Sequence, residues 1–152
     1  MRVCLSSLPD EREDERVIDI QSVLPHRYPF LLIDQVVCKE ELTYAKGIKL
    51  VSRGDWFMNR NEENPKMPEV LILEAIGQLG AFVLPEKEKS LGLLSGMRNV
   101  RFFHSVHPGD QLDLEFEIIK LRSQAFKGRG TASVNGLKVA EVEEITVSYL
   151  RS

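Results

Sequence analysis

The chain has 152 residues, of which 43% are apolar and 28% charged, as expected for one globular domain. Its net charge of −3 argues against a nucleic-acid-binding protein, and no apolar run approaches the ~20 residues of a membrane-spanning helix. Cys4 and Cys38 lack metal-ligand spacing, and two cysteines are too few for a fold that depends on disulfide bonds. We therefore expect reduced thiols and a cytoplasmic protein.

Charge divides the chain near its start. Residues 9–16 carry seven charges in eight positions and have nothing to bury. We therefore expect residues 1–16 to form a flexible polar leader and residues 17–152 to form one domain.

Hydrophobic patterns after residue 17 predict several strands and one helix. Strands are expected over residues 30–37, 44–51 and 112–118, and a final strand ends at Tyr149. Asn135-Gly136 between two β runs predicts a hairpin. The run from Met67 to Leu84 is apolar almost all round and predicts a buried helix, which begins near Pro68 and ends before Pro85. One helix and about five or six antiparallel strands make an α+β domain, which would gain by pairing edge to edge with a second copy.

Two polar residues interrupt the helix pattern. Glu74 and Gln78 are four residues apart and therefore share a face. A buried carboxylate must be paired, protonated or turned to a cavity, so structural and functional interpretations of Glu74 carry equal weight. His26, His104 and His107 have no partner at a telling spacing, and structural or exposed roles are favoured for all three.

Four motifs, in order along the chain, resemble the β-hydroxyacyl-acyl-carrier-protein dehydratases of the FabZ type. They span residues 24–34, residues 67–75 with Gln78, residues 99–102 and residues 108–112. The resemblance implies a hot-dog fold, in which a curved antiparallel sheet wraps one helix, and a dimer that often assembles into a trimer of dimers. It also implies dehydration of a β-hydroxyacyl thioester on acyl carrier protein, without a metal or organic cofactor.

In such enzymes a histidine from one subunit and the helix glutamate of the other complete each site. The acyl chain lies in a tunnel at the dimer interface. Glu74 matches the glutamate, and the resemblance places Gln78, Phe57 and Met67 along the tunnel.

The chain departs from this family at the reacting centre. The family histidine lies fourteen residues before the glutamate, where this chain has Arg60, and the glycine whose N–H faces the thioester is Glu69. A second histidine of that loop is Asn64 here. Arginine holds its proton at any useful pH, so loss of the base alone would lower activity about 10²–10⁴-fold. Two alternatives are open for Arg60 and Glu69. Either they form an ion pair that fills the space of the substrate's thioester, or both side chains are exposed to solvent.

Three functions remain open. In the first, the chain pairs with a histidine-bearing subunit and supplies Glu74; this is favoured slightly over the second, a non-catalytic acyl binder. The third is an active dehydratase that uses His104, His107 or Glu74 alone. Acyl carrier protein is acidic, and a docking patch is expected at basic residues that are otherwise ordinary surface charges: Arg98, Arg101, Lys120 and Arg122.

Overall fold

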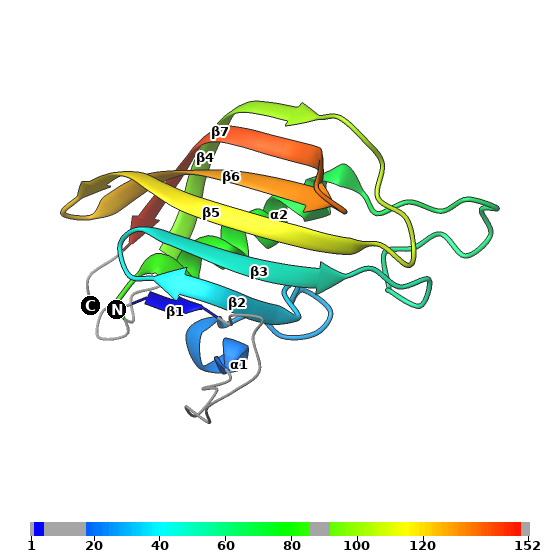
Figure 1. Ribbon diagram of the computed structural model, residues 1–152, viewed down its shortest axis with the longest axis horizontal. Coiled ribbons are helices and arrows are strands. Elements are labelled where there is room, and N and C mark those ends of the chain that lie inside the picture. The colour runs from blue at the N-terminus through cyan, green and yellow to red at the C-terminus, as the bar shows by residue number, and fades with distance from the viewer. Residues whose placement is uncertain (1, 5–17, 86–91, 150–152) are drawn as a thin grey trace.

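A curved antiparallel sheet wraps around one helix in the computed structural model, which describes residues 2–4, 18–85 and 92–149 (Figure 1). The helix is α2 (Glu69–Leu79), and a 3-10 turn (Gly80–Val83) continues it. A short helix, α1 (Ile20–Val23), lies between the first and second strands along the chain. In spatial order the strands are β1 (Arg2–Cys4), β2 (Gln35–Glu40), β3 (Tyr44–Leu50), β5 (Gln111–Arg122), β6 (Ala125–Val134), β7 (Leu137–Tyr149) and β4 (Gly92–Phe102).

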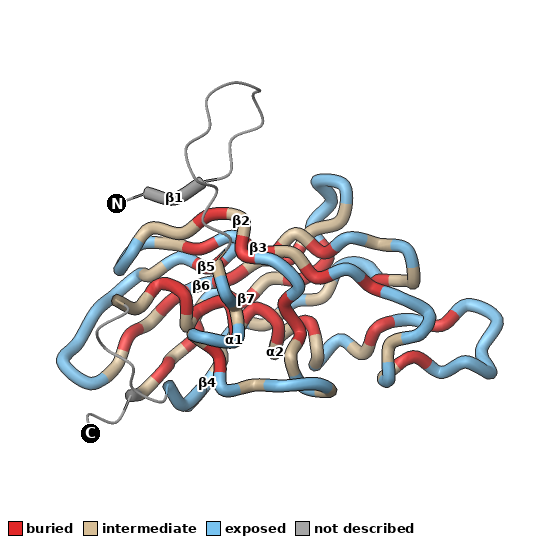
Figure 2. Tube along the Cα trace, turned by 90° about the horizontal axis from the view of Figure 1, so that it is seen from below, coloured by how far each residue is buried: buried red, intermediate tan, exposed pale blue. Residues whose placement is uncertain are grey.

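The helix lies tightly against the concave face of the sheet. Its side chains Ile72, Ala75, Ile76 and Leu79 are buried in the core, which Figure 2 shows as the buried interior of the curve. Gly130 on β6 makes the close approach possible, because a Cβ there would lie 2.2 Å from Cγ2 of Ile76. The arrangement confirms the predicted α+β hot-dog fold.

Two local predictions, the ends of the buried helix at proline residues and the hairpin at Asn135-Gly136, agree with the structure. The helix begins directly after Pro68, and its 3-10 continuation ends before Pro85, as expected. Asn135 and Gly136 have φ of 50° and 78° and join β6 to β7, which confirms the predicted hairpin.

The first predicted strand is wrong in its boundaries. Regular pairing begins at Gln35, not at Phe30. The backbone of residues 30–32 instead bonds to the side chain of Gln78, so this stretch follows the helix rather than a neighbouring strand.

The amino-terminal region is described only in part. Arg2–Cys4 forms β1, which pairs with β2, whereas residues 5–16 of the expected leader lie outside the described residues. The strand register places Cys4 opposite Cys38. Cys38 is disulfide-bonded, which corrects the expectation of reduced thiols.

The free edge of the sheet at β4 is unusually exposed. The burial pattern of this strand contains no buried residue, and its side chains Leu93 and Leu94 are 48% and 46% exposed. A long edge strand with exposed apolar side chains is a surface suited to pairing. Over the described stretches, no helix has the length and apolar character needed to cross a membrane.

Candidate functional site

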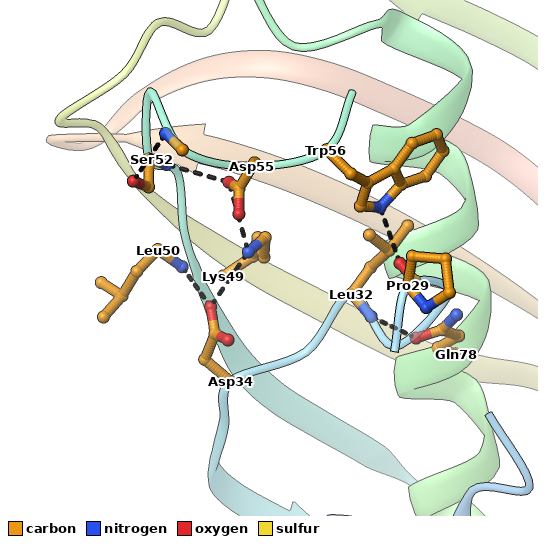
Figure 3. Close-up of polar contacts among 10 residues, drawn as sticks. Pro29, Leu32, Asp34, Lys49, Leu50, Ser52, Asp55, Trp56 and Gln78 are labelled. Carbon is orange, nitrogen blue, oxygen red and sulfur yellow. Dashed lines mark hydrogen bonds and ion pairs between the residues drawn. The ribbon is translucent and has the colours of Figure 1, made fainter. Parts of the chain in front are cut away.

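The site is organised around one buried amide on α2. The side chain of Gln78 is 3% exposed. Its Nε2 donates to the carbonyl of Phe30 at 2.7 Å and to Oε1 of Glu74 at 3.0 Å, and its Oε1 accepts from the N–H of Leu32 at 3.0 Å. Figure 3 shows the bond between Leu32 and Gln78 beside the helix. Gln78 therefore joins the segment that follows His26 to the face that carries Glu74.

An imidazole lies beside the helix glutamate within the same chain. Nε2 of His26 is 3.5 Å from Oε1 of Glu74, and the two side chains are 35% and 39% exposed. Nδ1 of His26 is buried and has no hydrogen-bond partner within residues 18–85 and 92–149. The site thus contains a carboxyl and an imidazole in contact, both partly open to solvent.

Both side chains line a cavity of about 790 Å³. This volume is within the range of small-molecule sites. Its lining also contains apolar side chains, among them Leu84, Phe126 and Val147. The cavity therefore combines a carboxyl and an imidazole with apolar surface.

The three expected tunnel residues occupy different places. Gln78 lines the cavity. Met67 is buried in the core at 1% exposure, and Phe57 packs partly buried against that core and edge-on to Trp56. Neither Met67 nor Phe57 lines this cavity within one chain.

The loop between β3 and α2 is anchored at its base. Nε1 of Trp56 donates to the carbonyl of Pro29 at 2.7 Å. Lys49, which is nearly buried, lies 3.5 Å from both Asp34 and Asp55 (Figure 3). These contacts fix the start of the loop, whose remainder projects beyond the sheet in Figure 1.

The residues that replace the family's histidine and glycine both lie at the surface. Arg60, Asn64 and Glu69 are exposed. Among the ion pairs of the described residues, none joins Arg60 to Glu69 or to Glu74. Within one chain, therefore, the two charges do not pair.

The other two histidines do not contact Glu74 within the chain. His107 is held at the base of the loop, where its Nδ1 lies 3.0 Å from the carbonyl of Pro65. His104 is exposed after the end of β4. Neither lines the cavity.

The basic residues expected to dock a carrier protein lie mostly among carboxylates. Arg101 binds Glu143 at 2.6 Å, and Arg98 lies 3.9 Å from Glu144. A hydrogen bond from Lys127 holds the pKa of Glu144 below its ordinary value, and the charge of Arg98 acts in the same direction. Lys120 and Arg122 are exposed near the end of β5.

Sequence reasoning underweighted His26. It is 48 residues from Glu74, so no helical or strand spacing could link the two. The available signal was its position inside the motif of residues 24–34. Glu74 itself was identified because a carboxylate interrupts an apolar helix. In the described part of the chain no cluster of His, Cys, Asp and Glu residues could hold a metal ion.

Comparisons with known proteins agree with this architecture. The model of the FabA-like domain family matches residues 24–143. The 3-hydroxyacyl-[acyl-carrier-protein] dehydratase FabZ of Geobacillus thermodenitrificans is 48% identical over 128 residues, which cover 82% of this chain and 88% of that one. The FabZ dehydratase of Bacillus subtilis is 46% identical, with coverage of 82% and 91%.

Among solved structures, the dehydratase heterocomplex ApeI:P from Xenorhabdus doucetiae matches with a TM-score of 0.77 at 21% identity, covering 90% of this chain and 94% of that one. The virulence protein Cj0977 from Campylobacter jejuni matches with a TM-score of 0.65 at 18% identity, with coverage of 84% and 82%. At these identities the structural matches establish the shared fold.

Proposed function

Because the chain belongs to the FabA-like domain family and is related to the FabZ dehydratases of fatty-acid synthesis, we propose that it binds β-hydroxyacyl thioesters carried on acyl carrier protein. The acyl chain would lie against the apolar surface of the 790 Å³ cavity, and the β-hydroxyl would lie beside Glu74. The curated relatives are named as dehydratases of acyl-carrier-protein substrates, and this chain shares nearly half of their residues.

We further propose that this chain acts as the glutamate-bearing half of a mixed site. The observation that carries this proposal is that Glu74 lines the cavity, while Arg60, which the resemblance places at the family's histidine position, lies on an exposed loop. Elimination needs a base for the α-proton, and arginine cannot accept one. A homodimer would therefore dehydrate its substrate poorly, whereas a histidine-bearing partner would complete the site at Glu74.

The surface around the site is suited to such a partner. Tyr28, Phe30 and Val70, beside the site, are 85%, 60% and 66% exposed, and Leu93 and Leu94 are exposed on the edge strand β4. Exposed apolar side chains that gather beside a site are typical of interaction surfaces. The dehydratase heterocomplex from Xenorhabdus doucetiae provides a precedent for two different subunits on this fold.

The proposal predicts complementation between two disabled proteins. The partner is a histidine-bearing FabZ-type dehydratase whose helix glutamate has been changed to glutamine. We expect neither protein alone to dehydrate a β-hydroxyacyl thioester appreciably, whereas the co-expressed pair should gain about 10²-fold or more, since one site would then hold both groups. Enoyl thioester formation by the purified pair measures the gain.

The matched control is the same pair with Glu74→Gln in this chain, which should show no gain. Size-exclusion chromatography of the pair tests whether the two chains form a complex. A stable complex without activity would contradict the mixed site, and exclusive formation of homodimers would also contradict it.

The proposed carrier-protein surface predicts a charge effect. Arg101→Glu combined with Arg122→Glu is expected to weaken carrier-protein binding about 10-fold at low salt, because each exposed charge contributes up to about 1 kcal/mol. Added salt should reduce the difference between wild type and variant. Lys46→Glu is the control: Lys46 is also an exposed, paired cation, 2.9 Å from Glu115, but it lies on β3 outside the proposed patch and its reversal should leave binding unchanged. Unchanged affinity of the double variant in titration calorimetry would dismiss the patch.

A further inference from the structure

We propose that His26 is a positioning residue that directs the acid proton of Glu74 onto its Oε2 oxygen. This inference rests on the proposed function, in which Glu74 is the retained acid. It concerns residues of one chain only and therefore does not depend on which subunit supplies the base.

Two side-chain nitrogens lie against the same carboxyl oxygen. Oε1 of Glu74 accepts from Nε2 of Gln78 at 3.0 Å and lies 3.5 Å from Nε2 of His26. The second distance is at the outer limit of a hydrogen bond, as contacts in empty catalytic sites often are. Among the described residues, no hydrogen bond reaches Oε2 of Glu74. A protonated carboxyl turns its unprotonated oxygen towards hydrogen-bond donors. Oε1 faces the donors, so the acid proton lies on Oε2.

The carboxyl of Glu74 selects the tautomer of His26. Nδ1 is buried and has no hydrogen-bond partner among the described residues, so it is unsatisfied in either neutral tautomer. Nε2 faces Oε1 of Glu74, an acceptor, at 3.5 Å, and the contact is favourable only when Nε2 carries the proton. The neutral ring therefore carries its proton on Nε2 and acts as a donor to the carboxyl. The same arrangement argues against His26 as the missing base, since Nε2 accepts a proton only when Nδ1 carries one.

The backbone around His26 is braced by Arg27. The guanidinium donates to the carbonyls of Leu24 at 2.7 Å, His26 at 2.8 Å and Gln21 at 3.2 Å. Gln78 holds the following residues through Phe30. The imidazole is thus fixed from both sides against the face of α2.

The positively charged side chains that share the cavity with Glu74 come from two elements. Arg27 of the motif segment and Lys39 of β2 line the same cavity as His26 and Glu74. The guanidinium of Arg27 is engaged by backbone carbonyls. His26 is therefore the residue whose N–H lies within contact of the carboxyl from outside its own helix.

The directed proton fits the elimination step. In the mixed site the partner subunit's histidine takes the α-proton, and the electron pair of the C–H bond forms the C=C bond. The C–O bond breaks, and the departing hydroxyl takes the proton from Oε2 and leaves as water. Glu74 is left as a carboxylate whose Oε1 remains held by Gln78 and His26. The protonated histidine then loses its proton to solvent, and Glu74 takes up a proton from solvent, which restores the site.

The test compares a variant that keeps an N–H with one that removes it. In the complementation assay, His26→Leu is expected to lower kcat about 10-fold with little change in KM, whereas His26→Gln should recover most of the loss because its amide retains a donor. In the Glu74→Gln background the effect of His26→Leu should disappear. His104→Leu, on an exposed segment away from the cavity, is the matched control.

A second readout does not require activity or a partner. Nitrogen-15 NMR of the chain alone should find His26 as the Nε2–H tautomer, and Glu74→Gln should shift its Nε2 signal. An Nδ1–H tautomer, or a signal that Glu74→Gln leaves unchanged, would overturn the proposal. Equal losses for His26→Leu and His26→Gln would also overturn it, because they would indicate only a structural role. Failed complementation with the expected NMR result would reject the mixed site while supporting the His26–Glu74 contact.

Discussion

Restoring the family's residues at two positions, Arg60→His with Glu69→Gly, is expected to raise the dehydratase activity of the homodimer by about 10²–10⁴-fold. The histidine would return a base for the α-proton. The glycine would remove a carboxylate from the first turn of α2, where backbone N–H groups would otherwise favour the negative charge that builds on the thioester oxygen. Both residues are exposed, so neither change should disturb the core. Steady-state kinetics on a β-hydroxyacyl thioester measure the gain.

The matched control places the histidine one position away. Asn61→His with Glu69→Gly introduces the same imidazole on the same exposed loop, but off the family's position, and should not raise activity. If the Arg60→His double variant is folded and also gains nothing, Arg60 is not what limits the homodimer. Rapid dehydration by the unmodified homodimer would also contradict the proposal that the homodimer is a poor dehydratase.

Changing Gln78 to leucine is expected to destabilise the protein by about 2–4 kcal/mol. Leucine approximates the shape of the amide, so the cost arises mainly from hydrogen bonds. The N–H of Leu32 loses its acceptor and the carbonyl of Phe30 loses a donor, and each buried group left unpaired costs about 1–3 kcal/mol. Chemical denaturation at one fixed protein concentration measures the change.

Gln111→Leu provides the comparison. Gln111 is exposed on β5 and donates to Asp113 at 2.9 Å, so its replacement should change stability by no more than about 0.5 kcal/mol. A similar small effect for Gln78→Leu would show that the segment of residues 30–32 does not depend on this amide. Gln78→Leu should also reduce complementation, because it releases Oε1 of Glu74.

Local patterns were sufficient for most of the fold. The apolar run between Pro68 and Pro85 predicted the buried helix, and Asn135-Gly136 predicted the hairpin that positive φ angles confirm. Alternation predicted the start of β5 but not its full length, because strand ends depend on partners. Residues 30–34 were misassigned for a related reason. Their composition favours a strand, but the side chain of Gln78 bonds the carbonyl of Phe30 and the N–H of Leu32 instead.

The residues of the candidate site could be predicted only in part. Position along the chain was enough to identify a glutamate on the apolar helix and an arginine where the resemblance expects a histidine. Which groups contact Glu74 could be learned only from the folded chain. Contacts between residues 48 positions apart depend on how the motif segment folds back over α2. That path is set by the bonds of Gln78 and Arg27, and it brings the ring of His26 to within 3.5 Å of the carboxyl.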